Sequence, residues 1–257
     1  MSAPAQARHL AWRSVVRTLR HPHMIMPTLV FPLFMLAVNA SGLQQATLIP
    51  GFPTDSYLTF TLGFAFLQGA IFAMLTAGTN LAQDIGTGFF TRLSLTPMRG
   101  SALLAGQLAS VLLLSFIQAV TYLTVGLLAG ADFESGAGGI PMLFALSFAI
   151  ACAFGSIGLF VGLRSASGET VQALFPMMFV LLFLSSAAMP RDLIEQDWFQ
   201  FVATINPVSY FVEGVRSLFI TGWDAQALAI AFGIAAAIFC AAIAASTGAV
   251  KTRMLRT

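Results

Sequence analysis

The sequence predicts an all-α integral membrane protein with six transmembrane helices. Of its 257 residues, 58% are hydrophobic and only 9% are charged, whereas a soluble globular domain carries roughly 25% charged residues. Long apolar stretches separate the charges, and each holds the roughly 20 residues that a helix needs to cross a hydrocarbon core of about 30 Å. These stretches are residues 21–54, 56–83, 100–131, 135–163, 170–190 and 225–250.

The apolar stretches divide the chain into three parts. We expect residues 1–23 to form a cytoplasmic interfacial helix, residues 24–250 the transmembrane domain, and residues 251–257 a short cytoplasmic tail. Inside the transmembrane domain, two connections are long enough to carry structure of their own. They are an inner loop, residues 84–100, and an outer segment, residues 190–224.

The charged residues indicate which ends of the spans face the cytoplasm. With the N-terminus inside, all but two of the 12 Lys and Arg residues fall on the inner side, the exceptions being Arg191 and Arg216. All but two of the 10 acidic residues, Asp84 and Glu169, fall on the outer side. Because cytoplasmic loops carry an excess of Lys and Arg, we expect a plasma (inner) membrane protein with both termini in the cytoplasm. The charges follow the two membrane sides, so the net charge of +2 does not indicate a nucleic-acid binder.

The segment before the first span has the pattern of an amphipathic helix. Trp12 begins an apolar stripe at helical spacing, and Arg13, Arg17 and Arg20 form a basic stripe beside it. Trp suits the boundary between lipid head groups and tails, and arginines attract anionic lipids of the cytoplasmic leaflet. We therefore expect the helix to lie in the membrane interface. The alternative is an anchor that only holds the N-terminus inside.

The inner loop carries large apolar side chains in an aqueous setting, which is unfavourable unless something covers them. Phe89, Arg92 and Leu93 lie at helical spacing. Asp84 precedes them, where a carboxylate favours a helix N-terminus, and Pro97 ends the pattern. We expect a short amphipathic helix that docks on a partner protein. The alternative is a helix folded back onto the membrane surface.

The outer segment is too apolar for a solvated loop and too often interrupted for a full span. Two short re-entrant helices that dip into the outer leaflet would satisfy both facts, since backbone polar groups in lipid must be paired internally. Asn206 is a good cap for the second helix, and Pro207 suits its first position. Glu213 and Arg216, three residues apart, are expected to form an ion pair that either holds this helix together or contacts substrate.

Residues that carry catalytic or metal chemistry are missing from the predicted spans. Cys152 and Cys240 lie in mid-span without neighbouring ligands, and we interpret them as packing residues. No Asp, Glu, His, Lys or Arg lies well inside a span, which argues against an intramembrane enzyme and an ion-coupled transporter. There is no G-x-x-x-x-G-K-[ST] phosphate loop, so we expect no ATPase activity. Gly158 and Gly162 allow close helix packing, within the chain or between subunits.

Two of these segments together resemble a known family of membrane proteins. The motif residues of the inner loop are Asp84, Gly86, Thr87, Arg92, Leu93, Thr96 and Pro97, and those of the outer segment are Trp198, Asn206, Pro207, Ser209, Tyr210, Glu213 and Arg216. Their order and spacing, with six spans and inside termini, resemble the permeases of ABC type-2 exporters such as the daunorubicin-resistance type. Phe89 and Phe90 depart from that pattern, because the family often has more polar residues there.

The resemblance implies a role for each segment. Residues 7–23 would be a connecting helix, residues 84–96 a coupling helix that fits a groove in an ATPase, and residues 191–220 re-entrant helices that close the pathway outside. A complete exporter would have two permease subunits, identical or related, and two ATP-binding-cassette ATPase subunits that bind ATP and Mg. The permease itself would bind no cofactor or metal.

The composition of the pathway suggests the cargo. A route lined by Phe, Met, Leu and small residues, without buried charge, suits an amphiphilic or hydrophobic cargo such as a drug or a lipid. Export of a polysaccharide or glycoconjugate by the same family is the alternative, although three Trp and three Tyr are few for stacking on sugars. A secondary transporter or channel outside the family is the remaining alternative.

Overall fold

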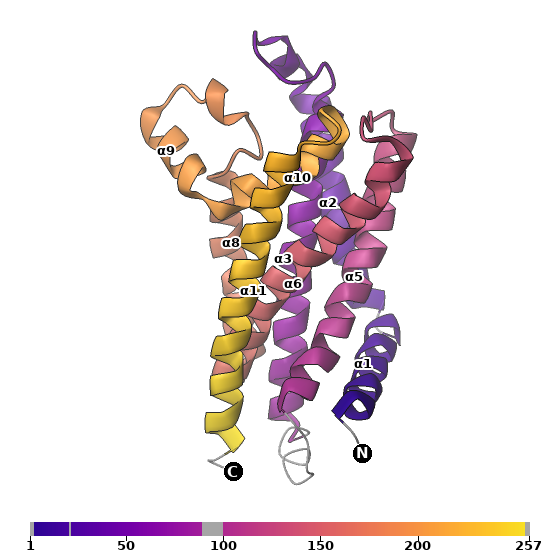
Figure 1. The fold of residues 1–257 in the computed structure, drawn as a ribbon, viewed down its shortest axis with the longest axis vertical. Coiled ribbons are helices and arrows are strands. Elements are labelled where there is room, and N and C mark those ends of the chain that lie inside the picture. Colours follow the sequence, from indigo (N-terminus) through magenta and orange to yellow (C-terminus); the bar gives the residue numbers. More distant parts are fainter. Residues whose placement is uncertain (1–2, 21, 89–99, 255–257) are drawn as a thin grey trace.

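The computed structural model describes the backbone of residues 3–20, 22–88 and 100–254, and within these ranges every regular element is a helix. The long helices run together along the tall axis of the molecule as a bundle (Figure 1). α1 (Ala3–Arg20) begins, and α11 (Ala225–Met254) ends, at the same end of this bundle (Figure 1). The prediction of an all-α fold is confirmed for the described residues.

The remaining helices fall into a long and a short class. The long ones are α2 (Pro22–Gly42), α3 (Tyr57–Gly86), α5 (Gly100–Leu128) and α6 (Gly136–Ser165). The short ones are α7 (Gly168–Gln172), α8 (Leu174–Phe183), α9 (Asp197–Ile205) and α10 (Pro207–Ile220), with the 3-10 helices η1 (Gln44–Leu48) and η2 (Arg191–Leu193).

Five helices of the described chain are long and apolar enough to cross a membrane. They are α2, α3, α5, α6 and α11, and they coincide with five of the six apolar stretches of the sequence. Their apolar parts cover residues 25–42, 57–86, 104–128, 136–165 and 225–249.

The fifth predicted span, residues 170–190, is shorter than expected. The apolar helix runs only from Gly168 to Phe183, which gives a length of about 24 Å against a hydrocarbon core of about 30 Å. It also breaks at Ala173, between α7 and α8. Pro176 explains the break, because it has no N–H to donate to the carbonyl of Gln172 and its ring crowds that carbonyl. Six full spans are therefore not confirmed.

α3 occupies the centre of the bundle, where it contacts α2, α5, α6 and α10. Phe60, Leu67 and Met74 on this helix are fully buried. Only 17% of the apolar stretch of α2, and of that of α11, is buried, and each helix has an outward face with exposed large apolar side chains, Phe34 and Ile230 among them. No described part of the chain covers these faces, as expected for helices that contact lipid in place of water.

α2 stays helical through Pro27 and Pro32. Pro32 has no N–H, so the carbonyl of Thr28 loses its partner within the helix. The hydroxyl of Tyr122 on α5 donates to this carbonyl at 2.5 Å. A neighbouring helix thus satisfies the backbone group that a proline leaves unpaired in an apolar setting.

α3 and α6 approach closely through three glycines. A Cβ on Gly78 would lie 2.5 Å from the carbonyl oxygen of Gly158. A Cβ on Gly158 would collide with the carbonyl oxygen of Met74, and one on Gly162 with that of Gly78. Gly158 and Gly162 therefore pack two helices of the same chain, so the interpretation within one subunit is confirmed for this pair.

We expect Gly162→Ala to lower the free energy of unfolding by about 1–3 kcal/mol, because the new methyl group meets backbone that cannot rotate away. Gly233→Ala on α11 is the matched control, since nothing lies within 4 Å of its Cβ position. That change should be neutral or raise stability by up to about 1 kcal/mol. Thermal unfolding of both purified variants measures the difference, and equal stability would contradict the close approach.

Candidate functional site

Asp84 lies in the last turn of α3, with its side chain only 5% exposed. The prediction that it starts the helix of the inner loop is wrong, because α3 continues past it to Gly86. Thr87 caps the end of α3: its backbone N–H and its hydroxyl both donate to the carbonyl of Gln83 at 2.9 Å. The carboxylate is therefore held at the C-terminal end of α3, a helix long and apolar enough to cross a membrane.

Four hydrogen bonds from three residues satisfy the Asp84 carboxylate. Arg13 on α1 is bidentate, with distances of 3.1 Å to Oδ2 and 2.9 Å to Oδ1. Arg17 donates to Oδ1 at 2.9 Å and also to Gln83 Oε1 at 2.7 Å. Gln107 on α5 donates to Oδ2 at 3.0 Å. Charge-assisted and bidentate bonds of this kind are the strong ones, so the Asp84 cluster joins α1, α3 and α5.

The Asp84 cluster changes the interpretation of α1. The predicted amphipathic helix is present, but Arg13 and Arg17 bind the protein and do not form a lipid-facing stripe, so that part of the prediction is wrong. Close packing holds the helix in place, because a Cβ on Gly106 of α5 would lie 2.5 Å from the Cβ of Leu10. Trp12 is 69% exposed and Arg20 is also exposed. The location of α1 in the membrane interface stays a prediction.

The inner loop connects α3 and α5, two of the helices that the Asp84 cluster joins. Gly86 and Thr87 end α3, and α5 begins at Gly100. The other predicted coupling residues, Phe89, Arg92, Leu93 and Pro97, lie outside the described residues. The coupling helix itself therefore stays a prediction.

The two short outer helices are present as α9 and α10. Asn206 caps α10, because its Oδ1 accepts the N–H of Val208 at 3.0 Å, and Pro207 occupies the first turn. The amide of Asn206 also donates to the carbonyls of Leu181 and Leu184, at 2.6 and 3.0 Å. These carbonyls belong to the end of α8, so Asn206 serves two helix termini at once. That the helices dip into the outer leaflet stays a prediction.

Arg216 is a buried cation at the outer end of α8. Its guanidinium donates to the carbonyls of Phe60, Ser186 and Ala187 at 3.0 to 3.1 Å. Its carbon Cζ lies 3.4 Å from the centre of the Phe60 ring. Phe60 lies in the first turn of α3, and Ser186 and Ala187 lie after the end of α8 at Phe183. Arg216 thereby fixes the segment that follows the shortened α8.

Glu213 pairs with Arg191 of η2 at 2.5 Å, and the predicted ion pair with Arg216 is wrong. Arg216 extends instead toward the carbonyls of Ser186 and Ala187, in the segment that follows α8. Burial lowers the pKa of Arg191, but Glu213 and Tyr210 outweigh it, so the net shift is upward and the guanidinium stays charged. Arg191 also lies over the Tyr210 ring, 4.7 Å from its centre. The sequence holds one indication of this pair. Arg191 and Arg216 are the two basic residues that the predicted topology places outside, so either of them was a possible partner for Glu213.

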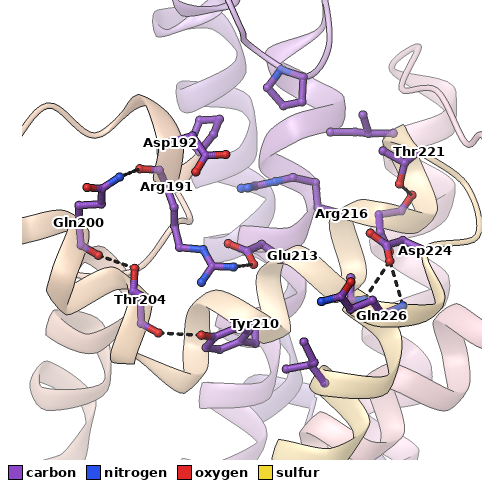
Figure 2. Close-up of a pocket in the computed structure, with 16 residues that line it drawn as sticks. Arg191, Asp192, Gln200, Thr204, Tyr210, Glu213, Arg216, Thr221, Asp224 and Gln226 are labelled. Atoms are coloured by element: carbon purple, nitrogen blue, oxygen red, sulfur yellow. Dashed lines mark hydrogen bonds and ion pairs between the residues drawn. The ribbon is translucent and has the colours of Figure 1, made fainter.

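A pocket of about 660 Å³ opens beside this ion pair (Figure 2). η2 and α9 line one side, the start of α11 lines the other, and α10 runs between them (Figure 2). Of the predicted outer residues, Tyr210, Glu213 and Arg216 face the pocket, whereas Trp198 lies on α9 outside it and is 61% exposed. In the described part of the chain, no group of His, Cys, Asp and Glu residues is arranged to hold a metal ion.

We expect the Asp84 cluster to stabilise the fold mainly by neutralising a buried carboxylate. Replacing Arg13 and Arg17 by Gln leaves that charge without a cation, which should cost about 3 kcal/mol. Adding Asp84→Asn removes the charge and should restore most of this loss. Arg20→Gln, at an exposed position on the same helix, is the control, with a change within about 0.5 kcal/mol. Unfolding of the purified variants tests the account, and absence of rescue would contradict it.

The two outer arginines should differ in importance. Arg216→Met leaves three backbone carbonyls without a donor, so we expect a loss of at least about 2 kcal/mol. Arg191→Met removes a partly exposed pair, for which about 1 kcal/mol is expected. Thermal unfolding of the two variants side by side measures the ranking. Equal losses, or a greater loss for Arg191→Met, would show that Arg216 does not hold the outer end together.

Comparisons with known proteins agree with these features. The family model for ABC-2 type transporters matches residues 5–220. The chain is 27% identical to the daunorubicin resistance ABC transporter permease protein DrrB1 of Streptomyces coeruleorubidus, over 83% of this chain and 74% of that protein. It is 24% identical to the putative transport permease ycf38 of Cyanophora paradoxa, over 82% and 72%, and 25% identical to that of Pyropia yezoensis, over 83% and 74%. This multi-pass chain belongs to the ABC-2 type transporter family.

Proposed function

We propose that the chain is the permease subunit of an ATP-binding-cassette exporter that moves an amphiphilic or hydrophobic substrate, a drug or a lipid, out of the cytoplasm. Partner ATPase subunits bind and hydrolyse ATP with Mg, and a second permease subunit completes the transporter. The name of the Streptomyces relative, a daunorubicin resistance permease, favours a drug among these cargoes.

The position of the charges is the observation that carries the proposal. The apolar parts of the five long helices hold no Asp, Glu, Lys, Arg or His from residue 25 to 42, 57 to 83, 104 to 128, 136 to 163 and 225 to 249. Transporters that couple to protons or ions use carboxylates at membrane depth. The energy for transport must therefore enter from outside the spans, and a partner ATPase supplies it.

The inner loop is the contact for that partner in this proposal. Arg13 and Arg17 attach α1 to Asp84, and Gln107 attaches α5 to the same carboxylate. The helix before the loop, the helix after it and α1 are thus joined through one carboxylate. A push from the ATPase on the loop would reach three helices together.

The proposed topology has both termini in the cytoplasm of a plasma membrane protein and six crossings. α7 and α8 supply the fifth crossing, which the re-entrant α9 and α10 complete on the outer side. Two observations support an even number of crossings: α1 and α11 meet the same end of the bundle (Figure 1), and Lys251, Arg253 and Arg256 follow the last span. Five crossings would place these cations outside, against the positive-inside bias.

We expect Phe89→Asp with Leu93→Asp to reduce co-purification of the ATPase, because charges would enter an apolar contact where loss of a central residue typically costs 2 kcal/mol or more. Leu48→Asp with Ile49→Asp is the matched control, two exposed apolar residues at the other end of the bundle. The control should leave the complex and its drug-stimulated ATP hydrolysis unchanged. A full complex with normal coupled hydrolysis in the loop variant would remove the loop from the ATPase contact.

A further inference from the structure

We propose that the pocket between η2, α9, α10 and α11 binds the protonated amine head group of an amphiphile. This inference rests on the proposed export function only for the direction in which the ligand travels. The pocket volume of about 660 Å³ lies in the range of small-molecule sites, roughly 300–1,000 Å³. It is therefore large enough for a head group together with the first part of an apolar chain.

The charges of the lining select a cation. Three carboxylates face the pocket, Asp192, Glu213 and Asp224, against the two arginines Arg191 and Arg216. Both arginines are already engaged: Arg191 pairs with Glu213, and Arg216 donates to backbone carbonyls.

Two carboxylates remain for a ligand. Asp192 is exposed and has no ion pair with any described residue. Asp224 uses Oδ1 to accept the N–H groups of Gln226 and Ala227 at 3.0 Å, which caps α11 and leaves Oδ2 open. In Figure 2 these two carboxylates come from opposite sides of the pocket. An amine between them gains attraction from both, whereas an anionic head group would meet a lining of net negative charge, three carboxylates against two arginines.

The surroundings of the pocket indicate that the ligand also has an apolar part. α9 is amphipathic: Gln200 and Thr204 line the pocket, and Trp198, Phe201 and Ile205 on the same helix are 61 to 67% exposed. This helix thus separates a polar chamber from an apolar surface of the kind that enters lipid. An amphiphile with its head in the pocket has room for its tail along that surface.

The apolar residues that line the pocket also favour a ligand with an apolar part. Ile220 of α10 and Ala227 and Ile230 of α11 are among the lining residues. Tyr210 is the one aromatic side chain among the lining residues, and Arg191 already covers its ring. A sugar chain would thus find little free aromatic surface, while an alkyl or ring system attached to an amine finds apolar contact.

Protection of an introduced cysteine tests the proposal directly. The chain, with Cys152 and Cys240 replaced by Ala, carries Gln226→Cys in the pocket and is placed in phosphatidylcholine nanodiscs without ATPase or ATP. The labelling rate with an impermeant thiol reagent is measured in the presence of decylammonium, 1-decanol or decanesulfonate. Leu128→Cys, at the end of α5 outside the pocket and 84% exposed, corrects for effects of the probes on the bilayer.

We expect decylammonium to slow labelling of Gln226→Cys relative to Leu128→Cys, and the alcohol and sulfonate not to. Asp192→Asn and Asp224→Asn should each raise the half-protecting concentration about fivefold. Asn preserves the helix cap at position 224, and thermal unfolding checks that each variant is folded. Glu195→Gln, an exposed acid outside the pocket, is the matched control and should leave the concentration unchanged.

Equal protection by all three probes, or unchanged protection in both aspartate variants, would overturn the amine site. Because no ATPase or ATP is present, these results do not depend on export. Export that proceeds while decylammonium gives no protection would remove this inference and leave the proposed function standing. Protection by decylammonium without any ATP-driven export would remove the proposed function and leave the amine site standing.

Discussion

A charged side chain loses its hydration inside a lipid bilayer, so it must lie at the end of a span or be surrounded by polar partners. This chain meets the requirement in both ways. Its five long apolar helices carry charges only at their ends. The two most buried charges, Asp84 and Arg216, each receive or donate several hydrogen bonds. The rest of the architecture follows from where these two groups are held.

Asp84 and Arg216 organise opposite ends of the same central helix. Asp84 ends α3 and joins it to α1 and α5. Arg216 binds the carbonyl of Phe60 in the first turn of α3 and the segment that follows α8. Between these points α3 contacts α2, α5, α6 and α10, so one packed helix joins the Asp84 cluster to the carbonyl that Arg216 binds. The close contact of Gly78 with α6 leaves little room for α3 to bend at that point.

Short-range sequence patterns correctly predicted the individual helices and their starts. Apolar length gave five spans, helical spacing gave α1, and the Asn206 and Pro207 pair gave the start of α10. The contacts of Asp84 and Arg216 could not be predicted, since Arg13 lies 71 positions from Asp84 and Arg216 lies 156 positions from Phe60. The spacing of Glu213 and Arg216 suggested an ion pair, but Arg216 binds the carbonyls of Ser186 and Ala187 after α8 instead.

Orientation in the membrane is the claim on which the inner loop, the outer pocket and the direction of transport all depend. Gly86→Cys at the end of α3 and Asp132→Cys before α6, each exposed, test it in intact cells with an impermeant thiol reagent, in a chain whose Cys152 and Cys240 are replaced by Ala. We expect the cysteine at 132 to react and that at 86 to react only after the membrane is opened. The opposite pattern would place the Asp84 cluster outside and contradict the account.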